Sequence, residues 1–295
     1  MNKYYSLVAT LLFYYTNAFA LMGMPEPEST RIMSAAGAGV GTLSLNDAPL
    51  LNPASVVFFR KSSFYYQRSN ESLQDKSDDR SGKYSDGQTD ITTIIDTSSG
   101  INGGISYQQQ NLESGDRTRF AASLAGTISE STGLGFILRR TEENSSVIDD
   151  EVYNQVVVGL THVYSEKLVI GFTTIDPSQE NSEYFQYTLG VQYTINKFID
   201  IIADVGSGDV ANREEESFNK WAIQLNSFKD VYIRYGRFHN FHANRKGTAW
   251  GISWMGPRLS LEYANKISEL ISNKTDIIYR DEKVFESSMN IVVLF

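Results

Sequence analysis

The chain ends in VFESSMNIVVLF, residues 284–295, and this stretch decides the fold. From Phe285 to Phe295 every second side chain is apolar apart from Ser287, while the positions between them begin polar and become apolar only near the end. Successive side chains of a β-strand point to opposite faces. A strand of about ten residues with an aromatic at each end and a polar second face is typical of a transmembrane β-barrel. The terminal strand therefore predicts a barrel in an outer membrane of the Gram-negative type.

The N-terminus has the three parts of a secretory signal. Lys3 supplies a positive charge, Leu7 to Tyr15 form a short apolar core, and Ala18 to Ala20 match a cleavage site. We therefore expect residues 1–20 to be a signal peptide and the mature chain to begin near Leu21. The rest of the sequence has no run of about 18 apolar residues, so no transmembrane helix is expected.

Composition argues against several classes of protein. Because the chain has no Cys, it has no disulfide, no thiol nucleophile and no Cys-based metal site. A net charge of −9 argues against a nucleic-acid partner, since phosphate binding requires a basic surface. The 17 Tyr and 16 Phe are many for a soluble acidic domain, whereas a barrel places aromatic residues in belts at both membrane interfaces.

From residue 62 onward, segments with alternating apolar and polar side chains follow one another to the end of the chain. We expect an all-β fold over residues 62–295, a transmembrane antiparallel barrel of about fourteen strands. The expected strands are 62–70, 88–97, 102–110, 118–128, 133–142, 151–163, 167–176, 184–194, 197–206, 217–226, 230–239, 246–255, 259–267 and 283–295. Short turns alternate with longer polar loops. Because short turns face the periplasm in such barrels, the C-terminus is expected there.

The side chains of single strands indicate which face meets lipid. Trp250, Ile252 and Trp254 share one face of the expected strand 246–255, while Gly251 and Ser253 lie on the other. This pattern fits a lipid-facing surface and a polar lumen. A soluble β-sandwich with one solvated face is the alternative, which the signal peptide and the even number of strands disfavour.

Charged side chains also occur at positions that face the lumen. These are Arg139, Asp200, Asp204, Lys220, Arg234 and Glu262. Because both signs are present, we expect a polar network that braces the interior of the barrel. Contact with a substrate is the alternative role for these residues.

Residues 21–61 do not have the pattern of a strand. The stretch from Ser34 to Gly41 is made of small residues, whose glycines permit close backbone packing, and Pro53 cannot donate to a β-ladder. We expect this segment to fold into the lumen as a hatch or plug.

The same segment carries a resemblance to a known family. Its Gly-Ala-Gly run, an Asp-Ala pair and an Asn-Pro-Ala triplet resemble the start of the long-chain fatty-acid transporter family (FadL type) and of related PorV-like barrels. The resemblance covers about residues 31–55, and this chain is short for that family. It implies a hatch inside a fourteen-stranded barrel that moves hydrophobic, fatty-acid-like molecules across the outer membrane. The residues that carry the motif are Gly37, Gly39, Asp47, Asn52, Pro53 and Ala54.

No motif points to catalysis or to a cofactor. His239 and His242 lie close together in the sequence, but no third metal ligand is placed beside them. The acidic runs at 149–151 and 214–216 are typical of solvated loops, and the Asp-rich stretch 75–90 lacks the spacing of an EF-hand. A G-x-S-x-G elbow and a nucleotide-binding βαβ unit are also missing. We expect no enzymatic activity and no cofactor.

Together these features predict a barrel that lets small hydrophobic molecules cross the outer membrane. Its partners would be outer-membrane lipid, a hydrophobic small-molecule ligand and the barrel-assembly machinery, which would engage the strand that ends at Phe295. The alternative is a non-transporting structural, adhesive or secretion-partner barrel whose outer loops bind a partner. An apolar cavity beside residues 35–55 would favour transport, and a lumen blocked from end to end would favour the alternative.

Overall fold

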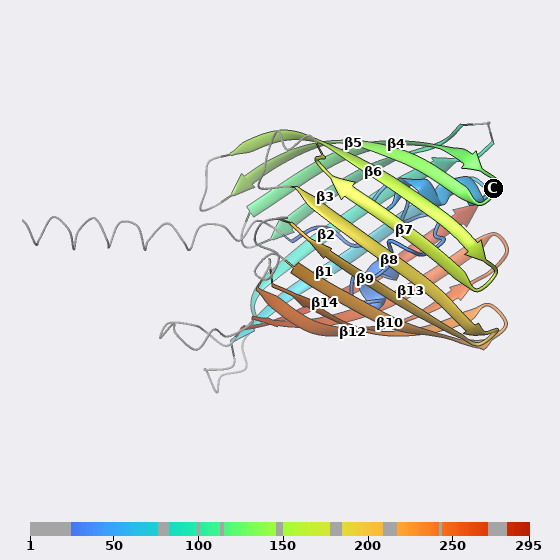
Figure 1. Ribbon diagram of the computed structural model, residues 1–295. Helices are drawn as coiled ribbons and strands as arrows, with labels where there is room; N and C mark the ends of the chain where they lie inside the picture. The colour runs from blue at the N-terminus through green and yellow to red at the C-terminus, as the bar shows by residue number, and fades with distance from the viewer. Residues whose placement is uncertain are drawn as a thin grey trace, which may run out of the picture.

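The structure is a computed structural model that describes residues 25–75, 83–98, 101–112, 115–145, 150–177, 185–208, 217–241, 244–270 and 282–295. The expected signal peptide lies outside these residues. Within them, fourteen antiparallel strands close into one barrel (Figure 1). The strands are β1 (Ser63–Asp75), β2 (Lys83–Asp96), β3 (Asn102–Leu112), β4 (Gly115–Ser129), β5 (Thr132–Ser145), β6 (Glu151–Ser165), β7 (Leu168–Ile175), β8 (Gln186–Asn196), β9 (Ile199–Ser207), β10 (Ser217–Phe228), β11 (Val231–Asn240), β12 (Arg245–Met255), β13 (Leu259–Leu270) and β14 (Glu282–Leu294).

The fourteen expected strands are confirmed, and the main difference lies at their ends. Residues 71–75 and 83–87 were expected to be loop, but they extend β1 and β2. A hairpin continues to pair its backbone groups after its side chains have become polar, so the apolar pattern marks only part of each strand. The stretch 75–90 is therefore largely strand in the described part of the chain.

The ring closes between the first and last strands. β1 pairs with β14 without interruption from Ser63 opposite Leu294 to Asp75 opposite Glu282. Beyond the strand end, Ser62 and Phe295 exchange two backbone hydrogen bonds of 3.1 and 3.0 Å. Closure leaves no unpaired sheet edge, which is what a hydrocarbon environment requires. Two- and three-residue turns lie at the end of the barrel that holds Phe295, and we call this the short-turn end and the opposite one the long-loop end.

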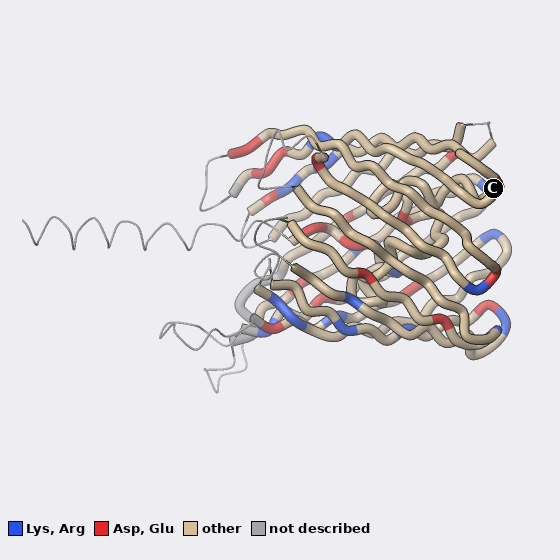
Figure 2. The backbone as a smooth tube through the Cα atoms, in the orientation of Figure 1, with Lys and Arg blue, Asp and Glu red and all other residues tan. Residues whose placement is uncertain are grey.

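The outside of the barrel is apolar and the inside is polar. Met289 of β14 and Phe295, which follows this strand, are 60% and 70% exposed, whereas Ser288 and Asn290 of β14 are buried inside. Trp250, like the other large apolar side chains of the outer face, is also exposed. In Figure 2 charged residues gather at the two ends of the barrel, with fewer in the middle of the strands. An apolar outer belt on a closed ring of strands is the surface of an outer-membrane β-barrel, so this expectation is confirmed.

Residues 25–58 run inside the ring from the long-loop end toward the short-turn end (Figure 1). They contain a short helix α2 (Thr30–Ser34), which contacts β11–β14, and a 3-10 helix η2 (Pro53–Phe58), which contacts β3–β6. No helix among the described residues is long and apolar enough to cross a membrane. We call residues 25–61 the N-terminal segment.

Candidate functional site

The N-terminal segment meets the wall of the barrel through side chains that were expected to face the lumen. Arg139 donates to the carbonyl oxygen of Leu50 at 2.6 Å. Asp204 accepts hydrogen bonds from the backbone N–H groups of residues 39 and 40, at 2.7 and 3.0 Å. Lys220 donates to the carbonyl oxygen of residue 37 at 3.3 Å. Three of the six predicted charges therefore hold the segment to β5, β9 and β10.

The other three predicted charges mainly connect strands to one another. Arg234 donates to Gln224 at 2.7 Å and to Ser253 at 2.6 Å, and Ser253 donates to Glu262 at 2.9 Å. Asp200 accepts from Gln224 at 2.8 Å. This chain of hydrogen bonds runs across β9–β13 on the lumen side. It fits the expected bracing role, since buried charges are stable where they are paired and hydrogen-bonded.

The motif residues hold the segment in its folded form. Asn52 donates from Nδ2 to Val40 O at 2.8 Å and to Thr161 Oγ1 of β6 at 3.0 Å. Its Oδ1 accepts from the N–H of Ala54 at 3.1 Å, which caps η2, and Pro53 follows at the first position of that helix. Asn52 therefore ties two parts of the segment to each other and to the wall.

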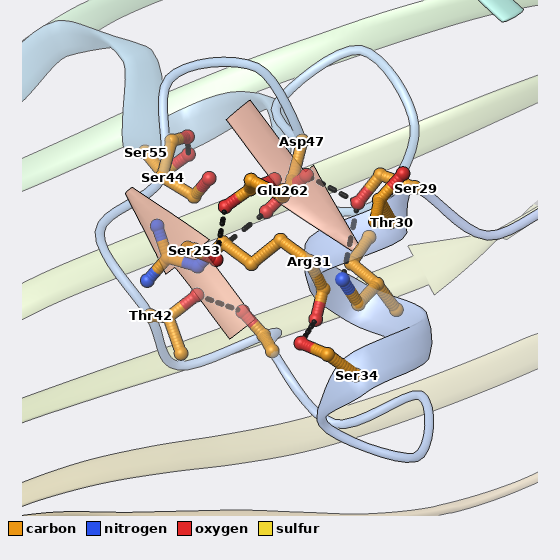
Figure 3. A network of polar contacts seen from close by, with 12 residues as sticks. Ser29, Thr30, Arg31, Ser34, Thr42, Ser44, Asp47, Ser55, Ser253 and Glu262 are labelled. Carbon is orange, nitrogen blue, oxygen red and sulfur yellow. Dashed lines mark hydrogen bonds and ion pairs between the residues drawn. The ribbon is translucent and has the colours of Figure 1, made fainter. Parts of the chain in front are cut away.

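Two further motif residues, Asp47 and Gly37, lie at the two ends of helix α2. Asp47 accepts from Ser29 at 2.5 Å, Ser29 caps α2 by accepting from Ile32 N, and these groups lie together in Figure 3. Gly37 follows the helix with φ of 85°, a left-handed conformation that glycine adopts without steric cost. The glycine is thus required by the turn that ends α2.

The wall provides room for this segment through glycines that face the lumen. A Cβ on Gly135 would lie 2.7 Å from the backbone of Pro53, and one on Gly251 would lie 2.5 Å from Ser34. A Cβ on Gly171 or on Gly190 would collide with the backbone of residues 40 and 41. Backbone therefore packs directly on backbone along β5, β7 and β8, and the Ser34 side chain packs on the backbone of β12. Only glycine permits such a close approach.

Sequence reasoning missed the ion pairs at the start of the segment. Glu26 lies against Arg119 of β4, with contacts of 2.5 and 3.0 Å between guanidinium nitrogens and carboxylate oxygens. Glu28 accepts from Lys266 of β13 at 2.8 Å. The run Pro25-Glu26-Pro27-Glu28 thus spans the lumen between two walls, and we call these four residues the strap. The sequence signal was the alternation of Pro with Glu, but its partners are distant in sequence.

The surroundings keep both strap carboxylates ionised. Loss of hydration inside the barrel would raise the pKa of Glu26, but the charges of Arg119, Arg117 and Arg139 outweigh it and hold the pKa below its usual range. Burial likewise opposes ionisation of Glu28, and Lys266 and Lys220 lower its pKa. A carboxylate with a lowered pKa in the folded state stabilises that state above its ordinary pKa and loses this contribution only in acid. The strap contacts are therefore fully present at neutral pH.

The cavity beside the strap is small and polar. Its volume is about 20 Å³, roughly the space of a single water molecule. Its walls include the strap, Met33, Glu71, Gln110 and Glu286. This is not the apolar cavity beside residues 35–55 that was considered as a sign of transport.

The histidines do not form a metal site in the described part of the chain. His162 contacts Thr132 at 2.9 Å between Nδ1 and Oγ1, and His239 stacks on Phe241 with ring centroids 4.1 Å apart. His242 lies outside the described residues. No group of three or more His, Cys, Asp or Glu is placed to hold a metal ion within the described ranges.

Comparison with known proteins shows that the same fold occurs in solved structures. No protein-family model and no curated protein matches this sequence. Among solved structures, the CymD monoaromatic hydrocarbon channel has a TM-score of 0.68 and 9% identity, over 90% of this chain and 97% of that one. The toluene transporter TodX of Pseudomonas putida has a TM-score of 0.64 and 9% identity, over 92% and 98%. The toluene transporter TbuX of Ralstonia pickettii has a TM-score of 0.58 and 11% identity, over 91% and 98%.

This chain has the fold of these hydrocarbon channels. The expected FadL-type architecture is thereby confirmed as a fold. At identities of 9–11% the likeness extends to the arrangement of the chain and not to its cargo.

Proposed function

We propose that this protein lets small hydrophobic molecules cross the outer membrane, with the N-terminal segment as a hatch. The observation that carries the proposal is how the segment is attached. Every neighbouring pair of strands in the ring is hydrogen-bonded, but the segment contributes no strand to the ring. Its contacts with the wall are side-chain hydrogen bonds, ion pairs and close packing. Parts of it can therefore move while the barrel stays closed.

The likeness to hydrocarbon channels supports this proposal. TodX and TbuX are described as toluene transporters, and their barrels align with nearly the whole of this chain. The sequence motif from Gly37 to Ala54 independently resembles the hatch of the FadL type. The family resemblance implies a fatty-acid-like cargo, and we include such a cargo in the proposed function.

Uptake by liposomes tests the proposal directly. Liposomes that carry the refolded protein should accumulate a hydrophobic fluorescent probe faster than empty liposomes. The matched control is liposomes with an equal amount of heat-unfolded protein, which allows for disturbance of the lipid. Equal uptake in all three preparations would refute transport and would leave the barrel fold intact.

The filled lumen favours a second candidate, a non-transporting barrel that binds a partner through its outer loops. The small polar cavity beside the strap is the specific observation for it. This candidate predicts that uptake stays at the level of empty liposomes even when the contact of Glu26 with Arg119 is removed. Increased uptake in the variant Glu26→Gln would instead favour the hatch.

A further inference from the structure

Three arginines on the lumen side converge on one carboxylate. The two Nη atoms of Arg119 lie 2.5 and 3.0 Å from the two oxygens of Glu26. Nη1 of Arg117 and Nη1 of Arg139 each lie 3.9 Å from an oxygen of Glu26. The three arginine side chains are only 1–4% exposed. We call them the arginine socket.

The socket has the chemistry of a carboxylate-binding site. A guanidinium that meets both oxygens of a carboxylate makes a strong and geometrically selective contact. Its wall also carries buried polar atoms without a hydrogen-bond partner among the described residues, namely Arg139 Nε, Gln155 Oε1 and Gln108 Oε1. Gln155 lies opposite Arg139 and Gln108 lies opposite Arg119 in the strand register. Since buried polar groups are normally paired, the Arg139 Nε donor is available to a ligand carboxylate, whereas the two glutamine oxygens are acceptors that require a donor such as a hydroxyl group or a water molecule.

The present occupant is part of the chain and is held by side-chain contacts rather than by strand pairing. Glu26 belongs to the strap rather than to a strand, and its side chain is 53% exposed. The neighbouring Pro25 accepts hydrogen bonds from Arg117 at 3.0 Å and from Gln110 at 3.3 Å. Withdrawal of the strap breaks these contacts without breaking a strand pair. Glu26 therefore occupies the socket in the way that a competing ligand would.

An apolar surface begins directly beneath the socket and has a limited length. Ala121 lies opposite Arg139, and Ile137 and Val157 follow on the same inner faces, all fully buried. Two residues further along β5, the position of Gly135 is closed by contact with Pro53. From Arg139 to Gly135 is four residues, or about 13 Å along a strand. The strip is about as long as one ring with its carboxylate and shorter than a long acyl chain, and its fully buried side chains become accessible only when the residues that cover them move.

We propose that the arginine socket binds a ring-sized monocarboxylate of the benzoate class, which takes the place of Glu26. The carboxylate of the ligand lies against Arg119, and its ring lies on Ala121 and Ile137. The inference rests on the proposed function, because the ligand reaches the socket through the lumen. It adds a preference for a negative charge, which toluene lacks.

Binding of labelled benzoate to the detergent-solubilised full-length protein tests the socket. The variant Glu26→Gln removes the internal competitor and should bind benzoate more tightly than the wild type. If the socket is vacant about a tenth of the time in the wild type, the gain in affinity is about tenfold. Benzyl alcohol has the same ring without the charge, so its binding should be equal in both proteins.

Matched variants separate the socket from general effects of charge. Arg119→Gln in the Glu26→Gln background should abolish the gain, and Arg139→Gln is a second test if that variant does not fold. Arg140→Gln removes a neighbouring arginine on the outer face of β5 and should leave benzoate binding unchanged.

Three outcomes would overturn the inference. They are equal benzoate binding by the wild type and Glu26→Gln, an equal gain for benzyl alcohol, and tighter binding of laurate than of benzoate at the same free concentration. Uptake of the uncharged hydrophobic probe is measured on liposomes that carry the same protein samples. Normal uptake without benzoate binding refutes the socket alone, whereas absent uptake refutes the proposed function.

Discussion

At the scale of single residues, the Asn52 side chain connects the N-terminal segment to itself and to the wall of the barrel. It is 2% exposed, and its amide group makes contacts with Val40, Ala54, Leu160 and Thr161. Donors and acceptors are both needed, because the Nδ2 group faces two carbonyl oxygens while Oδ1 faces an N–H group. A side chain of the same size without the donor cannot satisfy these partners.

The variant Asn52→Asp should therefore be less stable than Asn52→Ala. Alanine leaves buried carbonyl groups unpaired and removes a helix cap, at a cost of about 1–3 kcal/mol. Aspartate adds a buried charge that faces the carbonyl oxygens of Val40 and Leu160. Urea unfolding in lipid vesicles, followed by tryptophan fluorescence, measures both effects. The control Asn111→Ala, at an exposed position of β3, should stay within about 0.5 kcal/mol of the wild type. An Asn52→Asp variant as stable as the wild type would contradict this account of the site.

The motif residues were predictable from sequence, and the strap contacts were not. Asn52 and Asp47 stand in a local pattern that resembles a family, so their importance is visible in one stretch of chain. Glu26 and Arg119 are 93 positions apart, and their contact depends on how the segment enters the lumen. Arg139 was predicted to face the lumen from the alternation of β5, but its two partners in the segment were not predictable.

At the scale of elements, the path of the segment matches the glycines of the wall. Gly171 of β7 lies opposite Gly190 of β8, and residues 40 and 41 of the segment pack on this pair. Asp204 of β9 lies opposite Gly190 and accepts the backbone N–H groups of Gly39 and Val40. The two glycines leave room for the backbone of the segment, and the Asp204 carboxylate binds that backbone. We call Gly171, Gly190 and Asp204 the glycine seat.

Replacement of Gly171 by alanine should displace the segment from this seat. The added Cβ would collide with the carbonyl group of Val40, and overpacking of this kind costs about 1–3 kcal/mol. Gly126 of β4 is a matched control, because a Cβ there meets no atom within 4 Å. Limited proteolysis should cleave the segment faster in Gly171→Ala than in the wild type, with Gly126→Ala unchanged. Equal cleavage in all three proteins would show that the seat does not hold the segment.

The strands themselves were predictable because their signal is local. The two-residue period of a strand that separates lipid from lumen appears in about ten consecutive residues, as in β12, where Trp250 and Trp254 face outward and Ser253 inward. The ends of β1 and β2 were not predictable from this signal. There the strands continue among polar side chains, and backbone pairing alone sets their length.

At the scale of the whole molecule, the lumen is a filled core. Ala54 is fully buried inside the ring, Val40 is 1% exposed, and the segment makes hydrogen bonds to β1, β4, β5, β6, β9, β10, β13 and β14. The strap is held by side-chain ion pairs at the long-loop end. The part from Ser29 to Phe58 is packed against glycines, with further anchors on several strands. A barrel with this interior differs from a water-filled porin, whose lumen is an open channel.

The protein should therefore not admit small hydrophilic solutes, even without the strap. Proteoliposomes placed in an isosmotic solution of arabinose should swell no faster than empty liposomes, while a general porin in the same lipid should cause rapid swelling. A variant that lacks Pro25–Glu28 should behave like the wild type, because Asn52, Val40 and the glycine seat keep the lower lumen filled. Uptake of the hydrophobic probe by the same variant should rise, since removal of the strap opens the long-loop end toward the apolar strip at Ile137. Rapid swelling with arabinose in the wild type would show that the segment leaves the lumen as a whole, and swelling only in the strap variant would place the entire barrier in the strap.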